Sequence, residues 1–453
     1  MRRYIYLIGV LYIALNVVLL LAAPYGVHLE KGADAISWYT PALSLLKHGA
    51  FVTLADSTVL QTYRPPAYPV YEAFMLYIGN GNIISIIVGQ IILLWLVGII
   101  TYKIVEDIFP EKGILGLVLV IFNPNALGVA HLVQSDILYL FMVTITLYCL
   151  LLYSKEASFK LSLLIGFLFG LTCLVRPSGQ YLIFLFPLIY IVIGLLQKNG
   201  QFLVIHLSHS LLSAIVSVAV IFPWVQHNAS AGWGYNLATA EIEVVYFRDN
   251  VIYLDSILHN SSLNDSTKRI SKNEEEYISS YAEKWLQKNE QDKISAIASY
   301  YKKQLLNYDY KIVAKGFIDS WIGFFGAGGA VNLHNILELD GGRSIQIMSS
   351  SKSHVSRVDA VISTLSGLNS TALFISLFSF LYVAILRIFG LIGLIAMVKN
   401  KEYSLFFILT GVVTYFMLIS LFVGNSRYRL PIDPILIIMS VYGFSIFFKK
   451  RGV

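Results

Sequence analysis

The feature that most constrains this chain is a series of long apolar runs spread over most of its length. A stretch of about 20 consecutive apolar residues is enough for a helix to cross the hydrocarbon core of a bilayer. Ten runs approach this length, near residues 4–23, 82–104, 113–131, 133–152, 160–176, 179–197, 206–225, 376–398, 404–424 and 430–448. Because backbone polar groups in lipid must bond within the protein, we expect an all-α polytopic membrane protein with about ten transmembrane helices.

Composition agrees with this class. Of the 453 residues 57% are hydrophobic and only 13% charged, whereas a soluble domain is about a quarter charged. The net charge of +6 is explained by basic residues in cytoplasmic loops, so we expect membrane lipids around the chain and no nucleic acid. The first apolar run is longer than the apolar segment of a signal peptide, which predicts a retained first helix.

Basic residues between the runs predict the orientation. If the N-terminus is cytoplasmic, the inner segments hold twelve Lys and Arg residues and the short outer segments hold six. This asymmetry favours both termini in the cytoplasm. We therefore expect an N-terminal transmembrane module (1–225) with an outer first loop (24–81), an extracytoplasmic, mostly helical domain (226–370) and a C-terminal transmembrane module (371–453). Within that domain, 273–306 reads as helical, with acids early and lysines late.

Few ionisable residues lie within or beside the apolar runs. They are Asp34, Arg64, Glu72, Asp136, Arg176, Arg387, Arg427, Arg429 and Asp433. A charge at membrane depth is costly and usually faces a cavity or a partner. On the predicted orientation all except Arg387 lie near the outer side, and a planar guanidinium can bond two phosphate oxygens at once. Arginines at one leaflet, between apolar walls, predict a site for a lipid-linked phosphate.

Six motifs follow one another along the chain. They are DAISWYTPALSLLKHGAF (34–51), TYRPPAYPVYEAF (62–74), SDILYLF (135–141), GLTCLVRPSG (170–179), FPWVQHNASAGWGYNL (222–237) and SRYRLPIDP (426–434). In this order they resemble the motifs of bacterial GT-C glycosyltransferases, in the branch of the protein O-mannosyltransferases and lipid A aminoarabinose transferases. The resemblance covers residues 1 to about 240 and about 371 to the end, and the middle of the outer domain matches no motif.

The resemblance implies a GT-C-type bundle in a bacterial inner membrane and an enzyme that transfers a sugar on the extracytoplasmic side. The donor would be a polyprenyl-phosphate sugar and the acceptor a lipid, a glycan or a protein. A carboxylate that takes the acceptor's proton typically contributes 10²–10⁴-fold in rate, and a single base predicts inversion at the anomeric carbon. The resemblance gives that role to Asp34; the alternative, which can hold as well, is a helix cap for residues 35–47.

The arginines have competing interpretations. Arg64 would hold the donor phosphate or contact a lipid headgroup. One of Arg427 and Arg429 would hold the phosphate, or both would anchor anionic lipid. Arg176 would bind donor or pair with Asp136, with equal weight.

The remaining candidates are supporting residues. We expect Asp136 to be structural, Glu72 to be solvated rather than to orient Arg64, and Asp433 to pair with Arg429. Aromatic residues stack on sugars but are also common at membrane interfaces. The candidates to line a sugar site are Tyr39, Tyr63, Trp233 and Tyr235.

Two departures from the family pattern limit what the resemblance implies. Ala35 stands where most members carry a second acid after the first. The site's metal is therefore unknown, and the sequence leaves open a divalent ion as cofactor. His227 stands where an arginine is expected, which leaves one phosphate contact open. The competing functions are a flippase or transporter of lipid-linked sugars and an O-antigen ligase or polymerase. A transporter would show midplane polar groups and repeats, and a ligase an Arg/His-rich outer loop.

Overall fold

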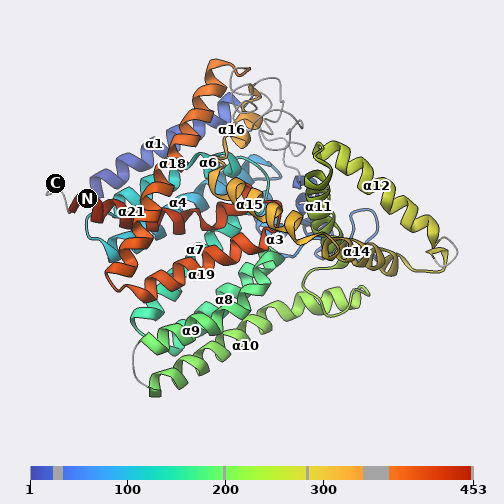
Figure 1. Ribbon diagram of the computed structural model, residues 1–453, viewed down its shortest axis with the longest axis horizontal. Helices are drawn as coiled ribbons and strands as arrows, with labels where there is room; N and C mark the ends of the chain where they lie inside the picture. Colours follow the sequence, from blue (N-terminus) through green and yellow to red (C-terminus); the bar gives the residue numbers. More distant parts are fainter. Residues whose placement is uncertain (1, 24–33, 197–199, 282–284, 340–366, 450–453) are drawn as a thin grey trace.

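The computed structural model describes residues 2–23, 34–196, 200–281, 285–339 and 367–449, and in these residues the chain is helical without a β-strand (Figure 1). The only strand-like pairing in this part is an isolated bridge between Val52 and Leu60. The bundle helices are α1 (Arg2–Ala22), α4 (Ile84–Ile108), α5 (Gly113–Ile121), α6 (Pro124–Ala130), α7 (Asp136–Lys155), α8 (Phe159–Val175), η2 (Pro177–Phe184), α9 (Leu185–Leu196), α10 (Gly200–Ser230), α18 (Ser370–Lys399), α19 (Tyr403–Ile419), α20 (Ser426–Arg429), η4 (Leu430–Ile432) and α21 (Asp433–Lys449).

Each of the ten apolar runs falls on one of these helices or on a joined pair. Within the described residues, seven continuous helical segments are long and apolar enough to cross a membrane. An eighth would be α5 with α6, which bend by 52° at their junction, where Asn123 caps α6 and Pro124 is its first residue. The other two, α8 and α19, are apolar but shorter. The all-α polytopic architecture is therefore confirmed.

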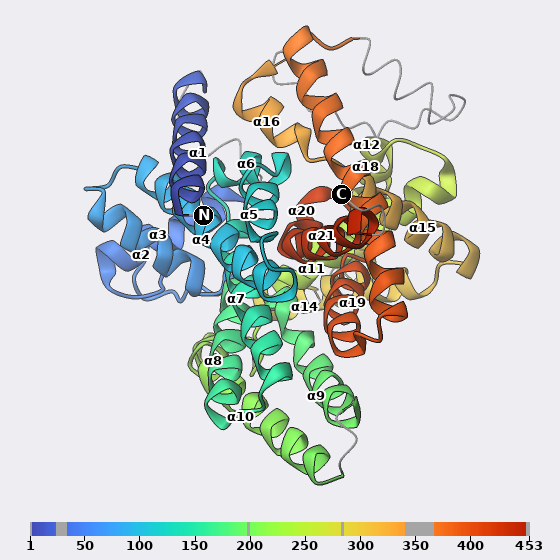
Figure 2. The same ribbon diagram turned by 90° about the vertical axis from the view of Figure 1, so that its left-hand side faces the viewer.

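Small residues allow the bundle helices to approach closely. Gly166 and Gly170 of α8 face α10, and a Cβ on Gly166 would lie 2.5 Å from the carbonyl oxygen of Ser213. Ser217 of α10 donates to the carbonyl of Gly166 at 2.9 Å. Small residues and hydroxyl donors are the usual means of helix association in membranes, where lipid is as apolar as leucine. Seen from one end, α8, α9 and α10 gather as one lobe and α18, α19 and α21 as another (Figure 2).

The remaining helices lie at one end of the bundle (Figure 1). Two belong to the first loop, α2 (Ala35–His48) and α3 (Ala67–Ile78). The others are α11 (Ala240–His259), α12 (Leu263–Ser280), α14 (Glu290–Leu306), α15 (Tyr310–Gly326) and α16 (Ala330–Ile336). In Figure 1, α12 and α14 project from the end opposite to that where α1 begins and α21 ends. A small core of Val251, Ile252, Ile270 and Tyr301 holds α11, α12 and α14 together.

The predicted helical stretch 273–306 is not one continuous helix in the part of it that the structure describes. The chain leaves α12 after Ser280 and enters α14 at Glu290. Asn289 marks the second start, because its side-chain oxygen accepts from the backbone N–H of Asp292 at 2.7 Å. An asparagine in this position satisfies one of the free N–H groups of a helix start. Trp285, between α12 and α14, packs edge-on against Tyr277 of α12.

Candidate functional site

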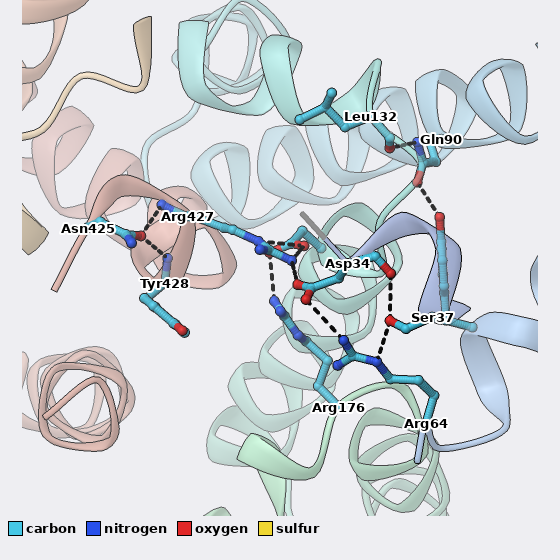
Figure 3. Close-up of polar contacts among 11 residues, drawn as sticks. Asp34, Ser37, Arg64, Gln90, Leu132, Arg176, Asn425, Arg427 and Tyr428 are labelled. Carbon is cyan, nitrogen blue, oxygen red and sulfur yellow. Dashed lines mark hydrogen bonds and ion pairs between the residues drawn. The ribbon is translucent and has the colours of Figure 1, made fainter. Parts of the chain in front are cut away.

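Five charged side chains from distant parts of the sequence form a chain of alternating sign, which we call the charge relay (Figure 3). Arg64 Nη2 lies 3.0 Å from Asp34 Oδ1, and Arg427 Nη2 lies 2.8 Å from Asp34 Oδ2. The Nε of Arg427 donates to both oxygens of Asp136 at 3.1 and 3.2 Å. Arg176 Nη1 completes the series at 2.6 Å from Asp136 Oδ1. Both oxygens of Asp34 are thus engaged by guanidinium groups.

Helix ends place these five residues. Asp34 directly precedes α2, but its side chain makes no capping hydrogen bond. Asp136 is the first residue of α7, where a negative charge is favoured by the helix dipole. Arg176 follows α8 and is extended because Pro177 ends the helix. Asn425 caps α20 by accepting from the backbone N–H groups of Arg427 and Tyr428, which fixes the segment that carries Arg427.

The charge relay holds a surplus of positive charge. Three guanidinium groups and two carboxylates leave one positive charge unbalanced. The Asp136 side chain is fully buried, whereas that of Asp34 is 31% exposed. Unbalanced charge in a partly buried site is costly unless a partner neutralises it. The open end at Asp34 can therefore accept an anion.

The pKa of Asp34 is set by opposing effects. Burial raises the pKa of this carboxyl, but the positive charges of Arg427 and Arg64 and the hydrogen bond from Arg427 lower it more, so its pKa falls below the usual value. Asp34 is therefore ionised at neutral pH. A carboxylate held in this way is a weak base until its arginine partners are shared with another anion.

Arg64 is positioned by Ser37 and Trp38, which the sequence did not single out, and by Tyr63, which was expected to line a sugar site. Its Nε donates to Ser37 Oγ at 2.9 Å, and its guanidinium lies 4.5 Å from the centre of the Trp38 ring. The ring of Tyr63 lies on it at 4.6 Å. Trp38 packs edge-on against Tyr68, which donates to Gln90. Ser37 and Trp38 follow Asp34 by about one helical turn, which is the signal that could have identified them.

Arg429 and Asp433 form a separate, buried pair. Arg429 is 1% exposed; its Nε donates to Asp433 Oδ1 at 2.7 Å and its Nη1 to the carbonyls of Phe324 and Ala327. The predicted pairing of these two residues is confirmed. Arg387, in the middle of α18, donates to the carbonyl of Phe325 at 3.2 Å and lies 3.9 Å from Asp433. These contacts join α15 to the C-terminal helices.

Glu72 contradicts its expected solvation. It is fully buried in α3, and burial raises the pKa of its carboxyl well above the usual value. Its position on α3, packed against α2 and α4, is a tertiary effect that local sequence does not reveal. The contacts of Arg64 are with Asp34, Ser37, Trp38 and Tyr63, so Glu72 is not among them.

The remaining candidates lie around rather than in the charge relay. His227 bonds through Nε2 with the carbonyl of Gln61 at 3.0 Å and stacks on Trp224, so it supports the loop that carries Arg64. Tyr39 packs half-buried against the cluster around Ala35 and Met75. Tyr235 is 70% exposed, and its side chain makes no hydrogen bond with the five residues of the charge relay.

The carboxylates of the charge relay face arginines. Both are bonded to guanidinium groups. Within the part of the chain that the structure describes, no group of three or more His, Cys, Asp or Glu residues could hold a metal ion.

An apolar groove lies beside the segment that follows Arg176. It has a volume of about 450 Å³ and lies between the segment that follows Arg176 (η2 and α9) and α19. Tyr181, Phe184, Leu188, Phe407, Gly411 and Tyr415 line it. Tyr415 donates to the carbonyl of Ser178, two residues after Arg176, and Arg176 lies 6.0 Å from the ring of Tyr139. The groove and Arg176 are thus linked by η2, which follows Arg176 directly and carries Tyr181 and Phe184 of the lining.

Known proteins share this architecture. Residues 63–227 match the family model of dolichyl-phosphate-mannose-protein mannosyltransferases. The oligosaccharyltransferase of Archaeoglobus fulgidus, in a complex with zinc and sulfate, superimposes with a TM-score of 0.50 at 12% identity, over 98% of this chain and 49% of that chain. The chain has the fold of the GT-C membrane glycosyltransferases.

Two further structures of the Archaeoglobus fulgidus enzyme agree. AglB with an inhibitory peptide and a dolichol-phosphate gives a TM-score of 0.50 at 13% identity, over 99% of this chain and 51% of that chain. The enzyme tethered to an acceptor peptide with the NVT sequon gives 0.51 at 12% identity, over 99% and 50%. The chain thus spans about half the length of the oligosaccharyltransferase chains it matches. No curated protein sequence matches it.

Proposed function

We propose that this chain is a membrane glycosyltransferase that takes a sugar from a polyprenyl-phosphate donor. The observation that carries the proposal is the charge relay, with one unbalanced positive charge, together with an apolar groove lined by the segment that follows Arg176. A lipid phosphate has the matching parts, an anionic head and a long apolar chain. The match to the family model of dolichyl-phosphate-mannose-protein mannosyltransferases and the fold shared with an oligosaccharyltransferase in complex with a dolichol-phosphate support the same donor class.

Arg64 and Arg427 are the proposed phosphate ligands. Both are partly exposed, with 13% and 24% of their side chains accessible, and both already bond an anion, Asp34. The N–H groups of Arg429 are committed to Asp433 and two backbone carbonyls, which argues for Arg427 as the phosphate ligand of the two. Arg176 is held by Asp136 and contributes its charge at the entrance to the groove.

Donor binding would activate Asp34. A phosphate that shares Arg64 and Arg427 withdraws them from the carboxylate, and the pKa of Asp34 then rises toward its usual value. The acceptor's oxygen or nitrogen attacks the anomeric carbon and its proton goes to Asp34. The bond between that carbon and the phosphate oxygen breaks, and its electron pair leaves with the phosphate. Fixed guanidinium groups stabilise the charge that grows there, and a single displacement inverts the anomeric centre.

The groove between α9 and α19 is the proposed site of the polyprenyl chain. Its lining is almost wholly apolar, and it begins at the segment that follows Arg176. Burial of apolar chain contributes about 0.8 kcal/mol for each CH₂ group, so even two isoprene units would anchor the donor.

The proposed setting is a bacterial inner membrane with the charge relay on the outer side. The excess of basic residues in the expected inner segments supports it. So does the position of α12 and α14 at the end opposite to the start of α1.

Turnover of a labelled donor tests the proposal. Purified protein in nanodiscs should release polyprenyl phosphate from a radiolabelled polyprenyl-phosphate sugar when membrane extract supplies acceptor, and Asp34→Asn should slow it by about 10²–10⁴-fold. If the protein instead moves the intact lipid-linked sugar across liposomes, and Asp34→Asn does so equally well, the chain is a transporter.

A further inference from the structure

A polar pocket separate from the charge relay lies in the outer domain. It has a volume of about 250 Å³ and is formed by the loop after α10, the start of α11 and one face of α14. Its polar lining includes Asn236, Glu243, Gln291, Ser295, Ser299 and Lys302. In the part of the chain that the structure describes, the side chains of Glu243, Ser295, Ser299 and Lys302 make no hydrogen bond or ion pair. The pocket therefore offers donors and acceptors to a ligand.

The loop that forms one wall is held in place by its own contacts. Gly232 and Gly234 have positive φ angles of 88° and 70°, a conformation that glycine adopts at little cost. The buried side chain of Asn228 donates to the carbonyl of Asn236 at 2.8 Å. Gln291 of α14 donates to the carbonyl of Ala231 at 3.3 Å. These contacts fix Trp233, which is half-buried at the pocket wall, and so preorganise the pocket.

The chemistry of the lining fits a carbohydrate. We propose that this pocket binds one sugar unit of a glycan acceptor, an inference that rests on the proposed transferase function. Hydroxyl, amide and charged groups would bond the sugar hydroxyls, and the Trp233 ring offers a flat apolar face for stacking. The volume lies just below the roughly 300–1,000 Å³ of pockets for drug-sized ligands, which suits a single ring.

The charges of the lining narrow the ligand class further. Glu243 and Asp292 against Lys302 leave one negative charge, which disfavours a phosphorylated or acidic unit. A neutral sugar, or one that carries an amino group, fits this balance. A peptide segment has less to bind here, because the pocket offers few apolar side chains and the described chain has no strand edge for β-addition.

The α11 helix connects the pocket with the charge relay. Ala240 and Glu243 line the pocket, and between them Glu241 accepts from Thr62 at 3.4 Å, two residues before Arg64. A sugar unit in the pocket would therefore lie against the helix that contacts the loop carrying Arg64.

Saturation-transfer NMR on the inactive Asp34→Asn protein in nanodiscs tests the inference. The probes are the methyl glycosides of neutral hexoses and N-acetylhexosamines and, as a competitor class, an unstructured hexapeptide. At least one glycoside should receive saturation, and Ser299→Tyr, which fills the pocket, should abolish it. Ser271→Tyr, at an exposed serine of α12 outside the pocket, is the matched control and should leave the signal unchanged.

A milder pair of variants guards against misfolding. Lys302→Ala should weaken glycoside binding by about tenfold through loss of a charged donor, whereas Lys303→Ala, exposed and outside the lining, should not. The absence of saturation for every glycoside, an equal signal in Ser299→Tyr, or binding of the peptide alone would overturn the inference. Loss of donor turnover with glycoside binding intact would overturn only the proposed reaction.

Discussion

Replacement of Asp34 by asparagine should change donor binding and turnover in opposite directions. In the charge relay Asp34 occupies one Nη of Arg64 and one of Arg427. The amide keeps the size of the side chain but removes its charge, so the surplus rises from one positive charge to two. The donor phosphate then no longer competes with a carboxylate for the two arginines. Binding should tighten while the proton acceptor is lost.

The charges set the size of the effect. At a separation of about 7 Å and an effective dielectric constant of roughly 20–80, one unit charge changes the binding free energy of a singly charged phosphate by about 0.6–2.4 kcal/mol. This corresponds to roughly 3- to 60-fold in Kd. The partial exposure of Asp34, 31% of its side chain, favours the lower half of that range. Turnover should fall by about 10²–10⁴-fold.

Titration of fluorescent polyprenyl phosphate into protein in nanodiscs measures the first effect, and release of labelled sugar measures the second. Asp56→Asn is the matched control, because Asp56 is an exposed acid of the same loop whose Oδ1 bonds Thr58 and is not part of the charge relay. It should leave both values near those of the wild type. Weaker phosphate binding in Asp34→Asn, or unchanged turnover, would refute the reasoning.

Three further outcomes are expected. In pH–rate profiles, the acid limb of kcat reports the donor complex and that of kcat/KM reports the free enzyme. The limb of kcat should lie at higher pH, because Arg427 and Arg64 lower the pKa of Asp34 in the free protein. Coincident or reversed limbs would count against the release of Asp34 from its arginines on donor binding. Asp433→Asn should lower the free energy of unfolding by about 3–5 kcal/mol, since it leaves the buried Arg429 without its carboxylate. Thermal unfolding should show this loss of stability, while the Kd for polyprenyl phosphate stays constant. A changed Kd would implicate Arg429 in donor binding. Gly411→Phe should fill the groove and weaken binding of long-chain polyprenyl phosphate at least about tenfold, while a short-chain analogue should bind as before. Gly326→Phe, where a Cβ would meet no neighbour, is the control. Equal losses of affinity for both lipids would exclude the groove as the site of the polyprenyl chain.

Much of the fold could be predicted from the sequence because hydrophobic length is a local property. All ten apolar runs fall on helices. Pro177 predicts that α8 ends just before Arg176. The bend between α5 and α6 has a local signal too, in Asn123 and Pro124. The break between α12 and α14 was missed because the lysines and acids of both helices continue one pattern, and only the cap at Asn289 separates them.

The site was less predictable because it depends on long-range contacts. Asp34 and Arg427 bond across 393 positions of sequence, and nothing local indicates the alternation of charge. Residues two apart on a helix face different directions, so the sequence indicates that only one of Arg427 and Arg429 faces a given cavity. Which one does so depends on the packing of α20 against α15. The burial of Glu72 is likewise a product of tertiary packing.

The most direct test is a structure of the Asp34→Asn protein with polyprenyl phosphate. The account predicts the phosphate within hydrogen-bond distance of Arg64 and Arg427, with the lipid chain between α9 and α19. A phosphate bound at Arg429, or a lipid bound at the bilayer midplane away from the charge relay, would contradict it.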